Sequence, residues 1–150
     1  MTRIREKFAE LDSKKEKALI AYIMVGFPNE KSTLSSIRGL VKGGVDIIEL
    51  GFPFSDPLAD GPVIQNASTI SLDRGTKIAK FFALVKKIRN ETDIPLILMT
   101  YTNILYHKDM QNLSLRPKRQ ELTDSSYQIC QLKNQKNIFR LQKIRQIQYS

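Results

Sequence analysis

The chain contains 150 residues, among them 24 Lys and Arg, 15 Asp and Glu, one His, one Cys and no Trp. This length suits one domain, and a hydrophobic fraction of 41% is enough for a packed core. Cys130 has no second cysteine for an internal disulfide, and Cys130 and His107 are too few for a Cys/His zinc cluster, so we expect no metal site. The apolar run at 18–27 is too short for a membrane helix and no small-residue cleavage site follows it, so we expect a cytoplasmic protein.

The net charge of +9 is concentrated in the last part of the chain. Residues 110–150 hold eight basic residues, two acidic residues and eight of the nine glutamines, whereas all seven glycines precede residue 110. We therefore divide the chain into a folded part, 1–109, and a basic Gln-rich tail, 110–150, which we do not expect to form a domain. Tyr127 and Phe139 lie twelve residues apart without a stacking pattern, so a solvated segment is favoured over a nucleic-acid-binding arm.

The spacing of apolar residues predicts alternating helices and strands in the folded part. Predicted helices cover 2–11, 31–41, 64–72 and 76–89, predicted strands cover 18–25, 45–50 and 94–101, and a loop with three prolines covers 51–62. Apolar strands between helices are typical of a parallel sheet, and no glycine-rich nucleotide-binding motif is present. We therefore expect an α/β fold that begins a (β/α)8 barrel. An intact barrel needs about 250 residues, so the chain supplies about three of the eight βα units.

Three carboxylates lie at or just after the end of the second predicted strand. Glu49 is near the carboxyl end of that strand, and Asp56 and Asp60 are in the following loop. Because barrel enzymes place their chemistry at this end of the strands, we expect the three side chains to converge on one mouth. A carboxyl group among apolar neighbours can act as a general acid, and a second carboxylate in different surroundings can act as a base. The alternatives are a strand-end ion pair for Glu49 and ordinary turn chemistry for the two aspartates.

Further candidates surround the same predicted mouth. Tyr101 and Asn103 follow the third predicted strand and would add polar groups to its rim. The rings of Phe27, Phe52 and Phe54, near the strand ends, suit an apolar pocket for a flat ligand, although three aromatic residues also suit a core.

The segment Glu49–Ala67, ELGFPFSDPLADGPVIQNA, resembles without a gap the signature of the tryptophan synthase alpha subunit family. Residues 23–28 resemble the family's first strand and turn, and residues 98–105 resemble its third strand, so the resemblance covers about residues 1–108. It implies a TIM (β/α)8 barrel and a lyase of tryptophan biosynthesis, which cleaves indole-3-glycerol phosphate to indole and glyceraldehyde 3-phosphate without a cofactor of its own. It also implies a partner in an alpha2-beta2 complex, the beta subunit, which carries pyridoxal phosphate and condenses the indole with serine.

The resemblance also implies roles for individual residues. Glu49 matches the acid/base that handles the proton at indole C3, and Asp60 matches the carboxylate that takes or stabilises the proton at indole N1. Pro53 and Asp56 match the loop that communicates with the beta subunit, and Tyr101 and Asn103 match a neighbouring loop that also faces this partner. No metal ligand is implied.

The tail departs from the family. The family's phosphate-binding loops and its mobile loop come from later strands, and a tail without glycine lacks the turns that present backbone N–H groups to phosphate. A barrel with three strands also has an open parallel edge. We therefore expect this truncated chain to be inactive alone and to be poorly soluble or molten. The alternative function is a catalytically dead fragment that only contacts the beta subunit.

A shifted reading frame would account for the composition of the tail. If one base is lost at the junction, Asp109 and Met110 stand in place of a Gly-Tyr pair. Back-translated residues 110–132, read in the restored frame, then give an amphipathic helix, a glycine stop and an apolar strand that ends in Pro-Asp. This order is the next βα step of a barrel and resembles the family's fourth-strand region. The alternative is a genuine evolved tail.

Overall fold

The computed structural model describes residues 3–101, Ile104 and residues 128–131. In chain order its elements are α1 (Arg3–Lys14), β1 (Ile20–Met24), α2 (Glu30–Lys42), β2 (Ile47–Gly51), α3 (Pro62–Asp73), α4 (Ile78–Arg89), β3 (Leu96–Thr100) and β4 (Gln128–Gln131). Each helix and strand predicted for the folded part is confirmed, with its ends displaced by a few residues.

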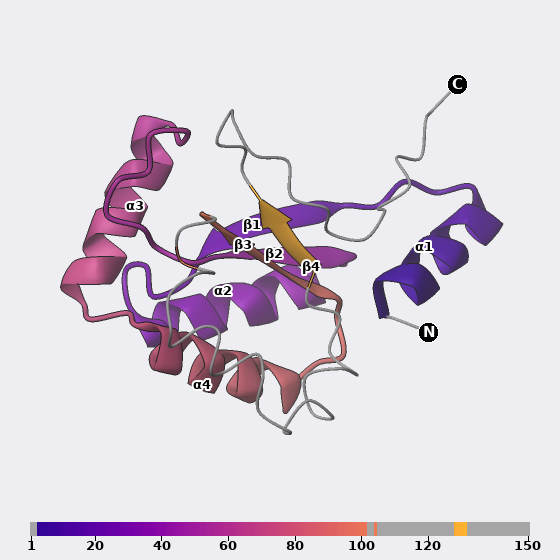
Figure 1. Ribbon diagram of the computed structural model, residues 1–150. Coiled ribbons are helices and arrows are strands. Elements are labelled where there is room, and N and C mark those ends of the chain that lie inside the picture. Colours follow the sequence, from indigo (N-terminus) through magenta and orange to yellow (C-terminus); the bar gives the residue numbers. More distant parts are fainter. Residues whose placement is uncertain (1–2, 102–103, 105–127, 132–150) are drawn as a thin grey trace.

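The four strands form one parallel sheet in the order β1-β2-β3-β4 (Figure 1). The register places Tyr22 of β1 beside Glu49 of β2, and Glu49 beside Ile97 of β3. Helix α2 connects β1 to β2, and α3 and α4 connect β2 to β3, which confirms the predicted start of a barrel.

Strand β4 goes beyond the three predicted strands. It lies in the tail and pairs with β3, with Ile129 aligned to Leu98 and Cys130 aligned to Met99. The outer edge of β3 presents backbone N–H and C=O groups that need partners, and β4 supplies them. The described part of the tail is this strand, so the division of the chain after Asp109 stays a prediction.

Helices α2 and α4 cover one face of the sheet (Figure 1). Phe81, Leu84 and Ile88 of α4 recur at helical spacing and are buried in the same core cluster as Ile48 of β2 and Leu98 of β3. Burial of each such side chain stabilises the fold by roughly 1.5–3 kcal/mol. This packing fixes which residues of each strand face the helices, and it leaves the alternate residues on the other face.

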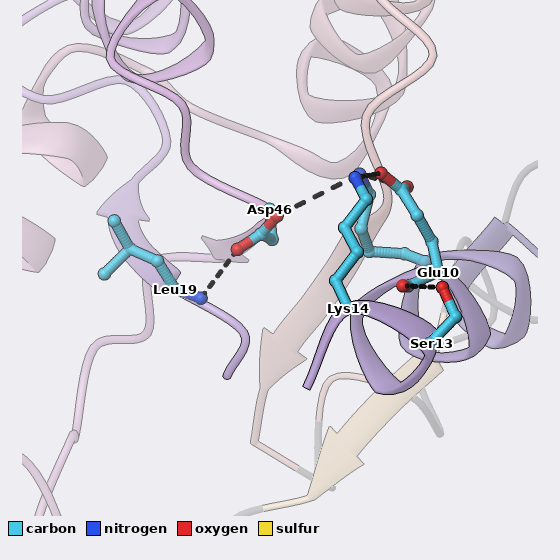
Figure 2. A network of polar contacts seen from close by, with 6 residues as sticks. Glu10, Ser13, Lys14, Leu19 and Asp46 are labelled. Atoms are coloured by element: carbon cyan, nitrogen blue, oxygen red, sulfur yellow. Dashed lines mark hydrogen bonds and ion pairs between the residues drawn. The ribbon is translucent and has the colours of Figure 1, made fainter. Parts of the chain in front are cut away.

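Helix α1 buries Ile4 and Leu11 and carries a cluster of charged side chains near the amino-terminal ends of the strands. Glu10 accepts a hydrogen bond from Lys14 at 2.7 Å (Figure 2) and another from Lys7 at 2.8 Å, and these two lysines hold the pKa of Glu10 at about 2. Asp46, which precedes β2, accepts a hydrogen bond from the backbone N–H of Leu19 at 2.9 Å and lies 3.9 Å from the Lys7 ammonium. The Lys7–Asp46 contact joins α1 to the end of the sheet opposite to the candidate site, whereas the Glu10 pairs lie within the helix.

The outer edge of β1 has no partner strand among the described residues. Leu19 and Ile20, at the start of this edge, are 59% and 44% exposed. A groove of about 620 Å³ runs between the edge and α2, lined by Leu19, Ala21, Tyr22, Ile23, Ser36, Gly39, Leu40, Gly43 and Val45. In the part of the chain that the structure describes, no helix has the length and apolar character that a membrane span requires.

Candidate functional site

Glu49 lies in the middle of β2 and projects from the face of the sheet that α2 and α4 do not cover. Its neighbours Ile48 and Leu50 are buried in the core cluster, whereas the Glu49 side chain is partly exposed, because successive strand residues face opposite sides. No hydrogen bond or ion pair joins its carboxylate to another described residue, so the strand-end ion pair finds no support within this part of the chain. Among the described residues, the carboxylate therefore keeps its capacity to accept hydrogen bonds.

The loop that carries Asp60 is fastened to helix α3. The buried Ser68 hydroxyl donates a hydrogen bond to the carbonyl of Phe54 at 2.9 Å and accepts one from its N–H at 2.8 Å. The Gln65 side chain donates to the Asp60 carbonyl at 2.8 Å, and the Asp60 N–H donates to the carbonyl of Pro57 at 3.0 Å. The backbone of the loop is therefore held on both sides of the candidate carboxylate.

Tyr22 reaches from β1 across to β2 at the carboxyl edge of the sheet. Its hydroxyl lies against the α-carbon of Gly51, so close that a Cβ at this position would collide with the phenol. Burial raises the pKa of Tyr22 to about 12, and the negative charges of Asp60 and Glu49 contribute to the increase. The phenol is therefore protonated at neutral pH, and it lies in the field of both candidate carboxylates.

Tyr101 holds the Asp60 loop from the end of β3. Its ring stacks on that of Phe54, with centroids 4.8 Å apart and planes 24° apart, and its hydroxyl accepts a hydrogen bond from the N–H of Ala59 at 3.2 Å. Burial raises the pKa of Tyr101; the Ala59 hydrogen bond opposes this effect, and the Asp60 carboxylate reinforces it. Tyr101, expected at the partner interface, is thus also part of the candidate site.

A small cavity lies among these groups. Its lining consists of Tyr22, Met24, Phe52, Phe54, Asp60, Ser68, Met99, Thr100 and Tyr101. The free volume is about 10 Å³, which is room for about one water molecule. The lining combines aromatic surface with one carboxylate and contains no basic side chain, so the described residues suit proton transfer beside a flat ring better than phosphate binding.

The structure brings some of the predicted residues together and separates others. The negative charges of Glu49 and Asp60 both raise the pKa of the Tyr22 phenol, whereas their convergence on one catalytic mouth stays a prediction. Asp56 is exposed on the loop, whereas the neighbouring Pro53 is fully buried. Asn103 lies outside the described residues.

Sequence reasoning missed Tyr22 and Gly51. The available signal was a tyrosine in a strand predicted to be buried, because a buried phenol hydroxyl needs polar surroundings. The need for glycine at 51 could not be seen before the register of β1 against β2 was known, since the two residues lie 29 positions apart.

Comparison with known sequences gives one family. The family model described as "Tryptophan synthase alpha chain" matches residues 8–123 and therefore reaches into the tail. The tryptophan synthase alpha chain of Aquifex aeolicus is 47% identical over 107 residues, which are 71% of this chain and 41% of the relative. That of Methanosarcina barkeri is 51% identical over 104 residues, which are 69% of this chain and 39% of the relative. The chain thus spans about two-fifths of the length of these curated relatives.

Solved structures show the same relationship. A structure from Aquifex aeolicus superposes with a TM-score of 0.72 at 37% identity, covering 85% of this chain and 59% of that one. Tryptophan synthase subunit alpha from Legionella pneumophila has a TM-score of 0.68 at 39% identity, covering 70% and 40% of the two chains. A tryptophan synthase complex from Pyrococcus furiosus has a TM-score of 0.56 at 42% identity, covering 59% and 37%. The chain therefore belongs to the tryptophan synthase alpha chain family.

Proposed function

We propose that this chain supplies the acid/base part of the site that cleaves indole-3-glycerol phosphate to indole and glyceraldehyde 3-phosphate. The observation that carries the proposal is the placement of Glu49 beside the half-buried Tyr22 in the register of β1 and β2, and of Asp60 in the lining of the same cavity as Tyr22. The loop that carries Asp60 follows the carboxyl end of β2, and barrel enzymes assemble their catalytic groups at this end of the strands. The reaction comes from the family, and the structure contributes the arrangement of the residues.

In the proposed reaction, Glu49 donates its proton to indole C3, and the Asp60 carboxylate stabilises the positive charge that develops at N1–H. The electron pair of the bond between C3 and the side-chain carbon then returns to the ring. At the same time the hydroxyl on that carbon loses its proton to the Glu49 carboxylate, which leaves an aldehyde and indole. Only protons pass between the protein and the substrate, and no oxidant or reductant is needed, so we propose that the chain uses no cofactor of its own and that pyridoxal phosphate belongs to the beta subunit.

We propose that the 150 residues do not complete this reaction alone. The cavity beside Asp60 has a free volume of about 10 Å³, whereas ligand pockets usually measure about 300–1,000 Å³. A phosphate group also needs cationic or N–H donors, and none of the side chains that line the described cavity is basic. The missing donors are those that the resemblance places on later strands of the barrel.

The proposed partner is the beta subunit. The loop and the start of α3 present apolar side chains to solvent, since Leu58 is 84% exposed and Val63 is 81% exposed. The acidic side chain of Asp56 is exposed on the same loop. Two exposed apolar side chains beside a charged one suit a protein interface, and they favour a second candidate function, a catalytically inactive chain that only binds the beta subunit.

The experiment is an indole-production assay with the chain alone and with added beta subunit, combined with co-elution of the two proteins. The chain contains no Trp, so indole fluorescence can be read without a background from the chain. We expect no indole from the chain alone. Indole formed when the beta subunit is added supports the enzyme, and co-elution without indole supports the inactive binding chain. If there is no indole and no co-elution, both candidate functions are contradicted.

A further inference from the structure

Tyr22 is the side chain that connects the two candidate carboxylates. Glu49 lies beside it in the register of β1 and β2, and Asp60 lines the same cavity as the Tyr22 side chain. Glu49 does not line this cavity, so the two carboxylates lie in different surroundings, and the negative charge of each acts on the phenol.

The Tyr22 phenol lies against Gly51 of β2. Gly51 is two residues beyond Glu49 and therefore lies on the same face of β2. The hydroxyl and the adjoining ring carbons of Tyr22 occupy the space that any larger residue at 51 would fill. The absence of a side chain at Gly51 therefore lets the hydroxyl lie against β2, two residues beyond Glu49.

We infer that Tyr22 is a positioning residue of this site: seated on Gly51, its hydroxyl directs its proton into the space between the Glu49 and Asp60 carboxylates and keeps their roles distinct. The inference rests on the proposed function, because it assigns Tyr22 a part in the same site. It adds a residue that the family signature at 49–67 does not contain.

The chemistry follows from the groups that are present. A phenol donates one hydrogen bond, and a carboxylate accepts it, so the phenol can satisfy one carboxylate and leave the other without that donor. Two carboxylates in unlike surroundings separate into an acid and a base. Asp60, held by its loop beside the phenol, is then oriented to accept from an N–H group of the substrate ring.

The test measures the ionisation of Tyr22 in the full 150-residue chain, and it does not require catalysis. The absorbance of tyrosinate near 295 nm is recorded at pH 11, and each protein is compared with its own Tyr22→Phe counterpart so that the difference reports Tyr22 alone. With the pKa of Tyr22 at about 12, we expect about one-tenth of this residue to be ionised.

Three variants identify the source of the effect. Asp60→Asn and Glu49→Gln each remove one negative charge, and each should increase the ionised fraction of Tyr22, while burial, the largest cause of the high pKa, remains. Asp56→Asn is the matched control, because it removes a charge from the exposed part of the same loop, and it should leave Tyr22 unchanged. The inference is overturned if Tyr22 ionises near pH 10 in the unmodified chain, if the Asp60 and Glu49 variants have no effect, or if the control has an equal effect. The proposed function would instead be contradicted by the indole assays, so the two can fail separately.

Discussion

Replacing Ile20 with lysine should suppress self-association of the chain. Ile20 begins β1, whose outer edge has no partner among the described residues, and an apolar groove of about 620 Å³ follows that edge. An unpaired apolar strand edge is a template for pairing with another chain, and lysine is the residue that natural sheets use to prevent this.

The exposure of Ile20 determines how much folding stability the substitution removes. Full burial of an isoleucine side chain contributes roughly 1.5–3 kcal/mol, and Ile20 is already 44% exposed, so Ile20→Lys should cost about 1 kcal/mol of folding stability. If two copies paired along this edge, each copy would place an ammonium group at the paired edge, which opposes the pairing. The balance favours the single chain.

The assay is size-exclusion chromatography with light scattering, together with the soluble yield. The control is Leu58→Lys, which adds the same charge at an apolar residue that is 84% exposed and lies on the β2–α3 loop. We expect association of the unmodified chain, loss of it in Ile20→Lys, and no change in Leu58→Lys. An equal effect of the two variants would mean that net charge, and not the strand edge, controls association.

Three further predictions concern the loop, the first helix and the tail. Ser68→Ala removes two hydrogen bonds to Phe54, which together contribute about 2 kcal/mol, so amide exchange at Phe54 should become faster. Thr69→Ala is the control, because the Thr69 hydroxyl bonds to Gln65 within α3, and it should leave this exchange unchanged. The Glu10 carboxyl should titrate near pH 2 by NMR, so its ion pairs stabilise the fold fully above pH 4.5 and are lost as pH falls toward 2. Lys14→Gln should move the midpoint of this titration upward, and an unchanged midpoint would contradict the assigned cause. Sequencing the DNA across the start of the tail should reveal an alternative open frame that encodes further βα units, and its absence would exclude the frameshift.

The sequence predicts the helices and strands of the folded part because their apolar residues follow helical or buried-strand patterns. Phe81 and Leu84, for example, recur on the core face of α4, and Ile48 marks a buried strand. Local pattern is sufficient there, since each element buries one surface against its neighbours. The pairing of β4 with β3 could not be predicted in the same way, because it depends on an edge that exists only after folding.

In the candidate site, too, some residues can be predicted from a local segment, whereas others depend on tertiary contacts. Glu49 and Asp60 can be recognised from a short segment, because strand end, loop and acidic residues are contiguous in sequence. The contact of Tyr22 with Gly51 depends on the register of two strands, and the fastening of the loop depends on Ser68 of α3. Tertiary contacts of this kind leave no local pattern in a single sequence.

The most direct test of the central claim, that Glu49 and Asp60 are the acid and base of an indole-forming site, uses a complete barrel. Residues 1–108 of this chain would replace the matching segment of the alpha chain from Aquifex aeolicus, and indole production would be measured in the chimera, in Glu49→Gln and in Asp60→Asn. We expect the chimera to form indole, Glu49→Gln to lose nearly all turnover while still binding substrate, and Asp60→Asn to be severely impaired. Normal turnover in either variant would contradict the role assigned to that residue.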